Sequence, residues 1–195
     1  MKRKRAAFLL ACGAICLIAA LGLTGYNLYD EYRAESSAES NVTQLRTVIQ
    51  EKAPEEQPIL PEPQVVMTAL ELDGRDYVGV LEIPSLGLSL PIQDEWSDRL
   101  LKYSPCRYEG TVYEGMIIAG HNYKSHFAKL KQLLPGDELQ FVDLDGNIWN
   151  YVVSGSEVIA GYDVERMKSG DWDLTLFTCT YGGENRYTLR CTLVI

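Results

Sequence analysis

The sequence predicts a mostly β domain, either a closed barrel or a sandwich, preceded by one N-terminal membrane-spanning helix. From residue 64 onward, short segments rich in β-branched and aromatic residues recur about every 8–12 residues, a spacing typical of barrels and sandwiches. Before them, residues 6–23 form an apolar run without a charged side chain, close to the length that crosses a bilayer. The 195 residues therefore divide into an anchor, a connecting segment and one β domain.

Turn residues separate the expected strands. Asp145-Gly146 lies between two apolar segments and is a hairpin signal. Pro91 favours an edge or the end of its strand, because proline cannot donate a ladder hydrogen bond. Within the β domain, helical periodicity is confined to residues 126–134 and 164–168. The expected strands are residues 77–83, 88–92, 115–119, 138–142, 148–153, 173–180 and 186–195.

The N-terminal run favours an uncleaved signal anchor over a cleaved signal peptide. Residues 6–23 are long for a signal-peptide core, and residues 19–22, Ala-Ala-Leu-Gly, are a poor cleavage site. Residues 2–5 are Lys-Arg-Lys-Arg, so the positive-inside rule places them in the cytoplasm and the chain beyond Tyr26 outside. We therefore assign residues 1–26 to a basic leader and a transmembrane anchor.

Residues 27–63 form a connecting segment of different composition. It holds eight acidic and three basic residues and ends in a cluster of prolines. We expect a stalk that holds the domain, residues 64–195, off the membrane. The alternative is an appendage that packs on the domain or covers its site. The spacing of Val42, Leu45, Val48 and Ile49 is helical, which indicates a short amphipathic helix within the segment.

The charge distribution excludes some classes of function. The net charge is −9, and the four cations of the leader leave −13 for the rest of the chain. An acidic domain does not suit nucleic-acid binding, which needs a basic surface. With only two histidines and no diagnostic acidic cluster, we expect no metal and no cofactor.

Three cysteines lie beyond the anchor: Cys106, Cys179 and Cys191. The odd number leaves at least one thiol without a partner in the chain, and a Cys106–Cys191 disulfide remains open. Cys179 ends an apolar strand before a glycine turn, where rigid scaffolds present reactive groups. Cys179 is therefore a candidate nucleophile, with a buried inert cysteine as the alternative.

A thiol nucleophile needs a base or an imidazolium beside it and a donor for the oxyanion. His121 follows an apolar strand and is the better candidate, because His126 has the pattern of a surface histidine at the start of a helix. Arg186 begins the strand after Cys179, so its guanidinium could reach an acyl oxygen. Arg190 lies roughly 13 Å further along that strand and is the weaker candidate, expected to be a solvated surface arginine.

These residues resemble the motifs of the sortase family. The similarity covers residues 77–195, in the family's order and spacing. Its elements are Thr175-Leu176-Phe177-Thr178-Cys179 with Arg186, Ala119-Gly120-His121-Asn122, Phe127-Ala128-Lys129-Leu130, the strand at 77–84 and the Gly136-Asp137 turn.

The resemblance implies an eight-stranded β-barrel and a cysteine transpeptidase outside the cell membrane. By this likeness, Cys179 attacks a C-terminal sorting signal similar to Leu-Pro-x-Thr-Gly in a secreted protein, and forms a thioacyl-enzyme. An amine of a cell-wall precursor or a pilin lysine then resolves it. His121 would be the general acid and base, Arg186 the oxyanion or substrate stabiliser, and Thr178 a substrate-binding residue. The alternative is an inactive barrel that serves as a binding or assembly subunit.

The subclass of sortase stays open. The segment before Tyr77 lacks the Asp-Pro-aromatic lid of many pilin sortases, and the connection at 159–173 is too short for the long helix typical of class B. Tyr162, Met167 and Trp172 could line the groove for the sorting signal or pack on the barrel.

Overall fold

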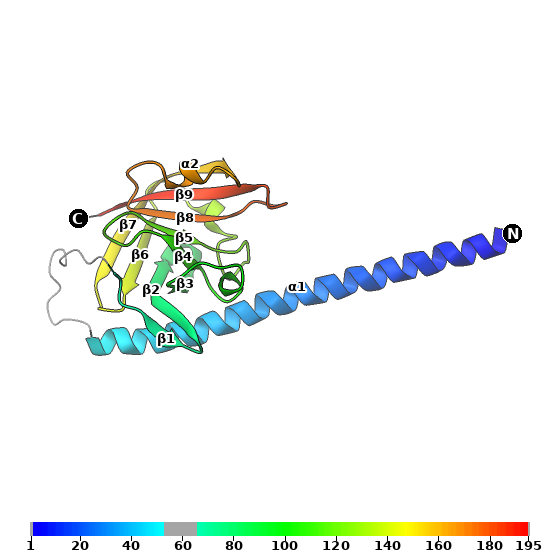
Figure 1. Ribbon diagram of the computed structural model, residues 1–195, viewed down its shortest axis with the longest axis horizontal. Helices are drawn as coiled ribbons and strands as arrows, with labels where there is room; N and C mark the ends of the chain where they lie inside the picture. The colour runs from blue at the N-terminus through cyan, green and yellow to red at the C-terminus, as the bar shows by residue number, and fades with distance from the viewer. Residues whose placement is uncertain (1, 53–65, 195) are drawn as a thin grey trace.

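The computed structural model describes residues 2–52 and 66–194, with side chains from residue 10 onward. It consists of one barrel and a long helix that lies along the barrel and projects beyond it (Figure 1). The helices are α1 (Lys2–Lys52) and α2 (Val164–Lys168), with short turns of 3-10 helix at η1 (Pro84–Leu86), η2 (Leu100–Lys102) and η3 (Leu130–Gln132). The strands are β1 (Leu70–Leu72), β2 (Arg75–Ile83), β3 (Leu88–Gln93), β4 (Cys106–Glu109), β5 (Met116–Ala119), β6 (Glu138–Asp143), β7 (Ile148–Ala160), β8 (Leu174–Cys179) and β9 (Asn185–Leu193).

The strands close into a barrel. Their order is β1-β2-β3-β4-β5-β8-β9-β7-β6, and β6 pairs again with β2. The closed ring therefore contains eight strands, with the three-residue β1 attached outside it. The β3–β4 and β5–β8 pairs are parallel, and the other pairs are antiparallel. The predicted eight-stranded barrel is confirmed.

The barrel interior is filled by large apolar side chains from most of its strands. Leu81, Ile118, Phe141 and Leu176 are wholly or almost wholly buried in one continuous cluster. Burial of this apolar surface is the main stabilising contribution to the fold. β4 was not predicted from the sequence, because its four residues include two charged side chains and are too short for their alternation to stand out.

Helix α1 passes through the expected boundary at residue 26 without a break. Among the described residues it is the one helix long and apolar enough to cross a membrane, and its apolar side chains near the N-terminus, such as Leu10 and Leu21, are exposed. An extended stalk is therefore absent from residues 27–52. The proline cluster and the boundary expected at residue 63 lie outside the described residues.

The second half of α1 packs on the barrel beside β2 and β3 (Figure 1). Its buried side chains recur every three or four residues and so lie on one face of the helix. The apolar ones are Ala34, Ala38, Val42, Leu45 and Ile49, and the polar ones are Asp30 and Asn41. This face contacts an apolar cluster that includes Tyr77 and Leu144. The segment thus follows the alternative weighed for it, an appendage packed on the domain.

The helix expected at residues 126–134 is wrong. The segment consists of turns and the single 3-10 turn η3. Its buried apolar residues, Phe127, Leu130 and Leu133, recur every three residues, which suits 3-10 turns better than an α-helix. Leu134, which the helical pattern placed on the apolar face, is exposed.

Candidate active site

His121 and Cys179 follow two neighbouring strands at the same edge of the barrel. In the parallel pair β5–β8, Ala119 lies opposite Phe177, and the Gly120 amide donates to the Phe177 carbonyl over 3.0 Å. His121 and Cys179 are each two positions further along. Because both strands run toward the same edge, the two residues lie near each other at that edge.

Arg186 lies on the other side of Cys179. The antiparallel pair β8–β9 places Cys179 directly opposite Arg186. Residues that face each other in this way have Cβ atoms about 4.5–5.5 Å apart and share one face of the sheet. Cys179 and Arg186 therefore face each other on β8 and β9, and His121 lies just beyond the end of β5, the strand on the other side of β8. These three residues are called the row below.

Cys179 is the accessible thiol of the barrel. It is half-buried and lines a cavity of about 250 Å³. Cys106 and Cys191 are buried, and burial raises the pKa of each thiol to about 12. Neither forms a disulfide, so the Cys106–Cys191 bridge left open by the sequence is absent. The other residues that line the Cys179 cavity are Asn122, Phe127, Ala128, Lys131, Thr178, Thr180, Tyr181 and Tyr187.

Thr178 precedes the cysteine and points to the opposite face of β8, as neighbouring residues of a strand do. It is buried and lines the Cys179 cavity. Its Oγ1 atom has no hydrogen-bond partner within residues 2–52 and 66–194. Thr178 therefore forms part of the cavity wall, and its role in substrate binding stays a prediction.

The imidazole of His121 is half-buried, and its Nε2 atom has no hydrogen-bond partner in the part of the chain that the structure describes. Burial lowers the pKa of His121, and the nearby Lys102 acts in the same direction. The Asp30 and Asp98 carboxylates oppose this and raise the pKa. Because these neighbours act on its pKa in opposite directions, the imidazole can both accept and donate a proton, as exchange with a thiol requires.

His126 does not match its expected place on the surface. It is fully buried, and burial lowers its pKa to about 4, with a smaller contribution from the His121 charge. The backbone of Tyr103 opposes this shift. His126 is therefore neutral near pH 7, and its ring packs in the core beside the site.

Arg186 is half-buried, and its Nη1 atom donates to the carbonyl oxygens of Gly183 at 2.8 Å and Asn185 at 3.1 Å. It forms no ion pair with any residue that the structure describes. Its charge is thus not neutralised by a carboxylate. It borders a second cavity, of about 180 Å³, whose other lining residues are Trp96, Tyr108, Ala160, Gly161, Asp163, Val164, Met167 and Phe177.

Sequence reasoning missed the aromatic part of this second cavity. Trp96 and Tyr108 meet edge to face with ring centroids 5.6 Å apart, and Tyr108 meets Phe177 in the same way at 5.5 Å. Trp96 and Tyr108 lie on or before β4, which was not predicted. Of the three residues proposed for the groove, Met167 lines this cavity, whereas Tyr162 and Trp172 line neither cavity.

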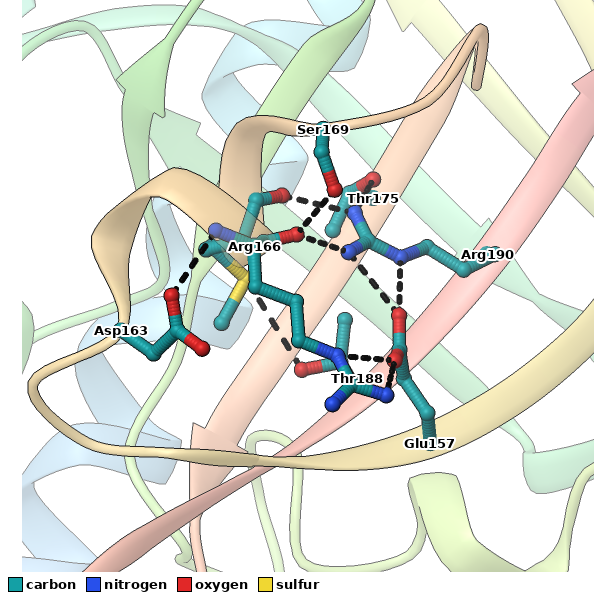
Figure 2. A network of polar contacts seen from close by, with 8 residues as sticks. Glu157, Asp163, Arg166, Ser169, Thr175, Thr188 and Arg190 are labelled. Carbon is teal, nitrogen blue, oxygen red and sulfur yellow. Dashed lines mark hydrogen bonds and ion pairs between the residues drawn. The ribbon is translucent and has the colours of Figure 1, made fainter.

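Arg190 is buried, so the expectation of a solvated arginine is wrong. Its guanidinium bonds to Glu157 through Nε at 3.1 Å and to the Thr175 hydroxyl through Nη1 at 3.0 Å (Figure 2). It also donates to the carbonyls of Arg166 at 2.9 Å and Met167 at 2.7 Å, in the last turn of α2. Arg190 therefore holds α2 against β8 and β9, and α2 supplies a wall of the second cavity.

No group of three or more His, Cys, Asp and Glu side chains that could hold a metal occurs within the described residues. The reactive groups that the barrel edge carries are a thiol, an imidazole and a guanidinium. The pairing of β8 with β5 on one side and β9 on the other brings His121, Cys179 and Arg186 to this edge.

The sequence model of the Sortase domain matches residues 81–194. The chain belongs to the sortase family. Sortases are cysteine transpeptidases, and the matched region carries all three residues of the row. The chain is also 28% identical over 193 residues to Sortase A of Bacillus anthracis. The alignment covers 88% of each protein.

Solved sortases have the same fold. Sortase C1 of Streptococcus agalactiae is 26% identical, with a TM-score of 0.56 over 64% of this chain and 71% of that one. A Clostridium perfringens sortase C, solved with the C-terminal cell wall sorting motif, is 22% identical, with a TM-score of 0.55 over 83% and 89%. The Sortase D5 transpeptidase of that species is 23% identical, with a TM-score of 0.55 over 62% and 80%.

Proposed function

We propose that this sortase is an active, membrane-anchored transpeptidase. It cleaves secreted proteins within a C-terminal sorting signal and transfers them to an amine. The observation that carries the proposal is the row of His121, Cys179 and Arg186 at one barrel edge. A thiol, a proton carrier and a cation side by side are the groups that acyl transfer requires. An inactive binding subunit would not require these three groups together.

In the first half-reaction, Sγ of Cys179 attacks the carbonyl carbon of the scissile peptide bond in a Leu-Pro-x-Thr-Gly-like signal. The S–C bond forms as the carbonyl electron pair moves to oxygen. The intermediate then expels the amine, which takes a proton from the His121 imidazolium. The product is a thioester between Cys179 and the secreted protein.

In the second half-reaction, an amine of a cell-wall precursor or of a pilin lysine attacks the thioester carbonyl. The amine loses a proton to His121, and the C–S bond breaks to release Cys179 as thiolate. One peptide bond is broken and one amide bond is formed, and both catalytic groups return to their starting charge. No cofactor enters either step.

Arg186 is suited to the oxyanion of both intermediates, or to the substrate backbone beside it. Its guanidinium lies opposite Cys179 and is not neutralised by a carboxylate of the described residues. Loss of one donor to an oxyanion typically lowers the rate by about 10²–10³-fold.

The apolar cavity beside Arg186 suits the apolar part of the sorting signal. Its walls include Val164, Met167 and Phe177, and it adjoins the row of the three site residues. A peptide whose scissile bond lies at Cys179 would thus extend its N-terminal residues toward α2. Apolar side chains in such a cavity contribute affinity, and the row supplies the chemistry.

The candidate span of α1 supports an anchor in the cell membrane. The basic residues 2–5 favour a cytoplasmic N-terminus, which leaves the barrel on the outer face, where sorting signals and cell-wall amines are found. The acidic domain would contact no nucleic acid.

The test is acyl transfer by the full-length chain in detergent micelles, from a library of Leu-Pro-x-Thr-Gly-like peptides to triglycine. We expect Cys179→Ala to abolish transfer and His121→Ala and Arg186→Ala to lower kcat/KM by about 10²-fold or more. Cys12→Ala with Cys16→Ala is the matched control, because both cysteines lie on the anchor. Full transfer by Cys179→Ala would refute the mechanism. Failure of the wild-type thiol to form an adduct with any thiol-reactive signal peptide would favour the inactive barrel.

A further inference from the structure

Helix α1 contacts the loop that carries His121. This loop, residues 120–126, is called the histidine loop below. The Tyr123 hydroxyl donates to Oδ2 of Asp30 at 2.7 Å, and the Lys124 amide donates to Oε1 of Glu31 at 3.0 Å. Each contact joins residues 93 positions apart in the chain. One turn of α1 therefore holds both a side chain and the backbone of the histidine loop.

The Tyr123 ring transmits this contact to the imidazole. Its centroid lies 4.7 Å from that of His121, with an angle of 31° between the rings, and 5.3 Å from that of His126. Tyr123 thus lies between a half-buried imidazole of the site and a fully buried one in the core. If the ring turned, the imidazole of His121 would lose the surface against which it lies.

Asp30 is well suited to hold the tyrosine. It is buried, and its second oxygen accepts from Arg33 at 2.6 Å, whose guanidinium lies over the Tyr103 ring at 4.9 Å. A buried carboxylate with two partners has little freedom to move. The Tyr123 hydroxyl stays protonated, because burial and the hydrogen bond to Asp30 raise its pKa.

We propose that Asp30 and Tyr123 are positioning residues, through which α1 sets the orientation of the His121 imidazole for acyl transfer. The inference rests on the proposed function, since it assigns His121 a proton to carry. By this inference, the helix that carries the candidate membrane span also contributes to catalysis at the site. Undocking of α1 would then change catalysis without any change in Cys179 or Arg186.

Several charged groups act on the pKa of His121, and their effect on its charge must be separated from the effect of the orientation of its ring. Asp30 comes from α1, and Asp98 and Lys102 come from the connection between β3 and β4. Arg33 of α1 acts on Tyr123, and the neutral His126 lies on the histidine loop itself. The Asp30 carboxylate raises the pKa of His121. Replacement by asparagine removes this charge but keeps an acceptor for Tyr123, so the imidazolium should be lost at lower pH.

The experiment measures kcat, KM and their pH dependence for the full-length chain in micelles. Tyr123→Phe keeps the ring and removes the hydroxyl, and we expect kcat to fall about 3–10-fold with KM nearly unchanged, because misplacement of a catalytic group lowers kcat. Asp30→Asn should preserve most of kcat and move the histidine-dependent limb to lower pH. Asp30→Ala should show both effects.

A second readout does not depend on turnover. The chain has two histidines, so ¹³C-labelled histidine gives two ring signals, and His121→Ala identifies one of them. We expect Asp30→Asn to lower the midpoint of the His121 titration, and Tyr123→Phe to shift its ring signal with a smaller change in midpoint. The matched control is Arg46→Gln, which removes the α1 contacts to Glu82 and Ser89 away from the histidine loop.

The inference would be overturned if Tyr123→Phe and Asp30→Ala left both kcat and the His121 ring signal unchanged. Cys179-dependent transfer in the same experiment would still uphold the proposed function. Equal losses in Arg46→Gln would also overturn it, because a general loosening of α1 would then explain them. Absence of any Cys179-dependent transfer would count against the proposed function, and the histidine titration would still decide whether α1 acts on His121.

Discussion

The histidine loop is held by contacts from α1, a helix outside the barrel. The α2 wall beside Arg186 is instead held by Arg190, a residue of the barrel strand β9. On the histidine side, the contacts come from a separate element remote in sequence, through Tyr123 and Asp30. On the arginine side, a buried guanidinium on a barrel strand caps the end of α2 (Figure 2). In Figure 1 the helices α1 and α2 lie on opposite sides of the barrel.

This difference separates two properties of the site. The α2 wall depends on the barrel itself, so it should persist for as long as the barrel is folded. The histidine loop depends on the docking of α1, which can change while the barrel stays intact. Changes on the arginine side should therefore alter stability and substrate affinity, and changes on the histidine side should alter kcat.

The largest expected effect concerns Cys179, which lies between the two sides. A charged, membrane-impermeant methanethiosulfonate at pH 8 should modify Cys179 and leave Cys106 and Cys191 unmodified. Both buried thiols have a pKa of about 12, so they should react at least about 10³-fold more slowly than an ordinary thiol with a pKa near 8.5. Mass spectrometry of the barrel peptides checks this. Cys179→Ala should show no adduct in the barrel, and labelling of Cys191 in the folded chain would contradict the buried position.

The next effect tests the arginine side. Arg190→Met should destabilise the barrel by about 3–5 kcal/mol, because Glu157 loses its buried partner and two α2 carbonyls lose their donor. Urea denaturation measures the difference. The matched control is Arg166→Met, which removes an exposed ion pair with the same Glu157 and should cost less than about 1 kcal/mol. Equal losses in the two variants would mean that the buried network does not support the wall.

On the histidine side, Leu45→Ala should weaken the docking of α1 by about 2–3 kcal/mol, because the leucine is fully buried against the barrel. Hydrogen exchange in residues 34–49 should increase, while exchange in β8 and β9 stays unchanged. Gln44→Ala, on the exposed face of the same turn, is the control and should change neither. Faster exchange in both strands would show that α1 and the barrel unfold as one unit.

The smallest effect tests the packing beneath the histidine loop. A Cβ atom at Gly120 would overlap the Phe127 ring, so Gly120→Ala should cost about 1–2 kcal/mol and displace the loop. Gly155→Ala is the control, since no atom lies within 4 Å of its added Cβ, and should stay within about 0.5 kcal/mol. Thermal denaturation and kcat measure the two consequences. A stable, fully active Gly120→Ala would show that the loop tolerates displacement.

Much of the barrel could be predicted from the sequence, because its strands carry local signals. The Asp145-Gly146 turn and the apolar segments on either side appear as the β6–β7 hairpin, and α2 has the predicted bounds. β1 and β4 could not be predicted, because segments of three or four residues become strands only when a neighbouring strand offers its edge. The 3-10 turn at Leu130–Gln132 shows that apolar spacing over one or two turns does not distinguish helix types.

The candidate site was predictable as a set of residues. The odd number of cysteines and the position of Cys179 at a strand end indicated the thiol, and the family motifs indicated all three residues. Their adjacency was not predictable from spacing alone, because it depends on the parallel pairing of β5 with β8. Arg190 and His126 were misplaced on the surface because a charged or polar side chain gives no sign in the sequence of the partners that bury it.

By itself, the sequence determined the anchor-like run, the β-rich domain and the chemistry of the site, because these follow from local composition, periodicity and motifs. Only the tertiary structure decided that α1 packs on the barrel and contacts the histidine loop. The physical reason is that Asp30 and Tyr123 lie 93 residues apart, and Arg190 meets α2 more than twenty residues before it in the chain. Such contacts arise from the docking of α1 and the packing of α2 on the closed barrel, which no short segment encodes.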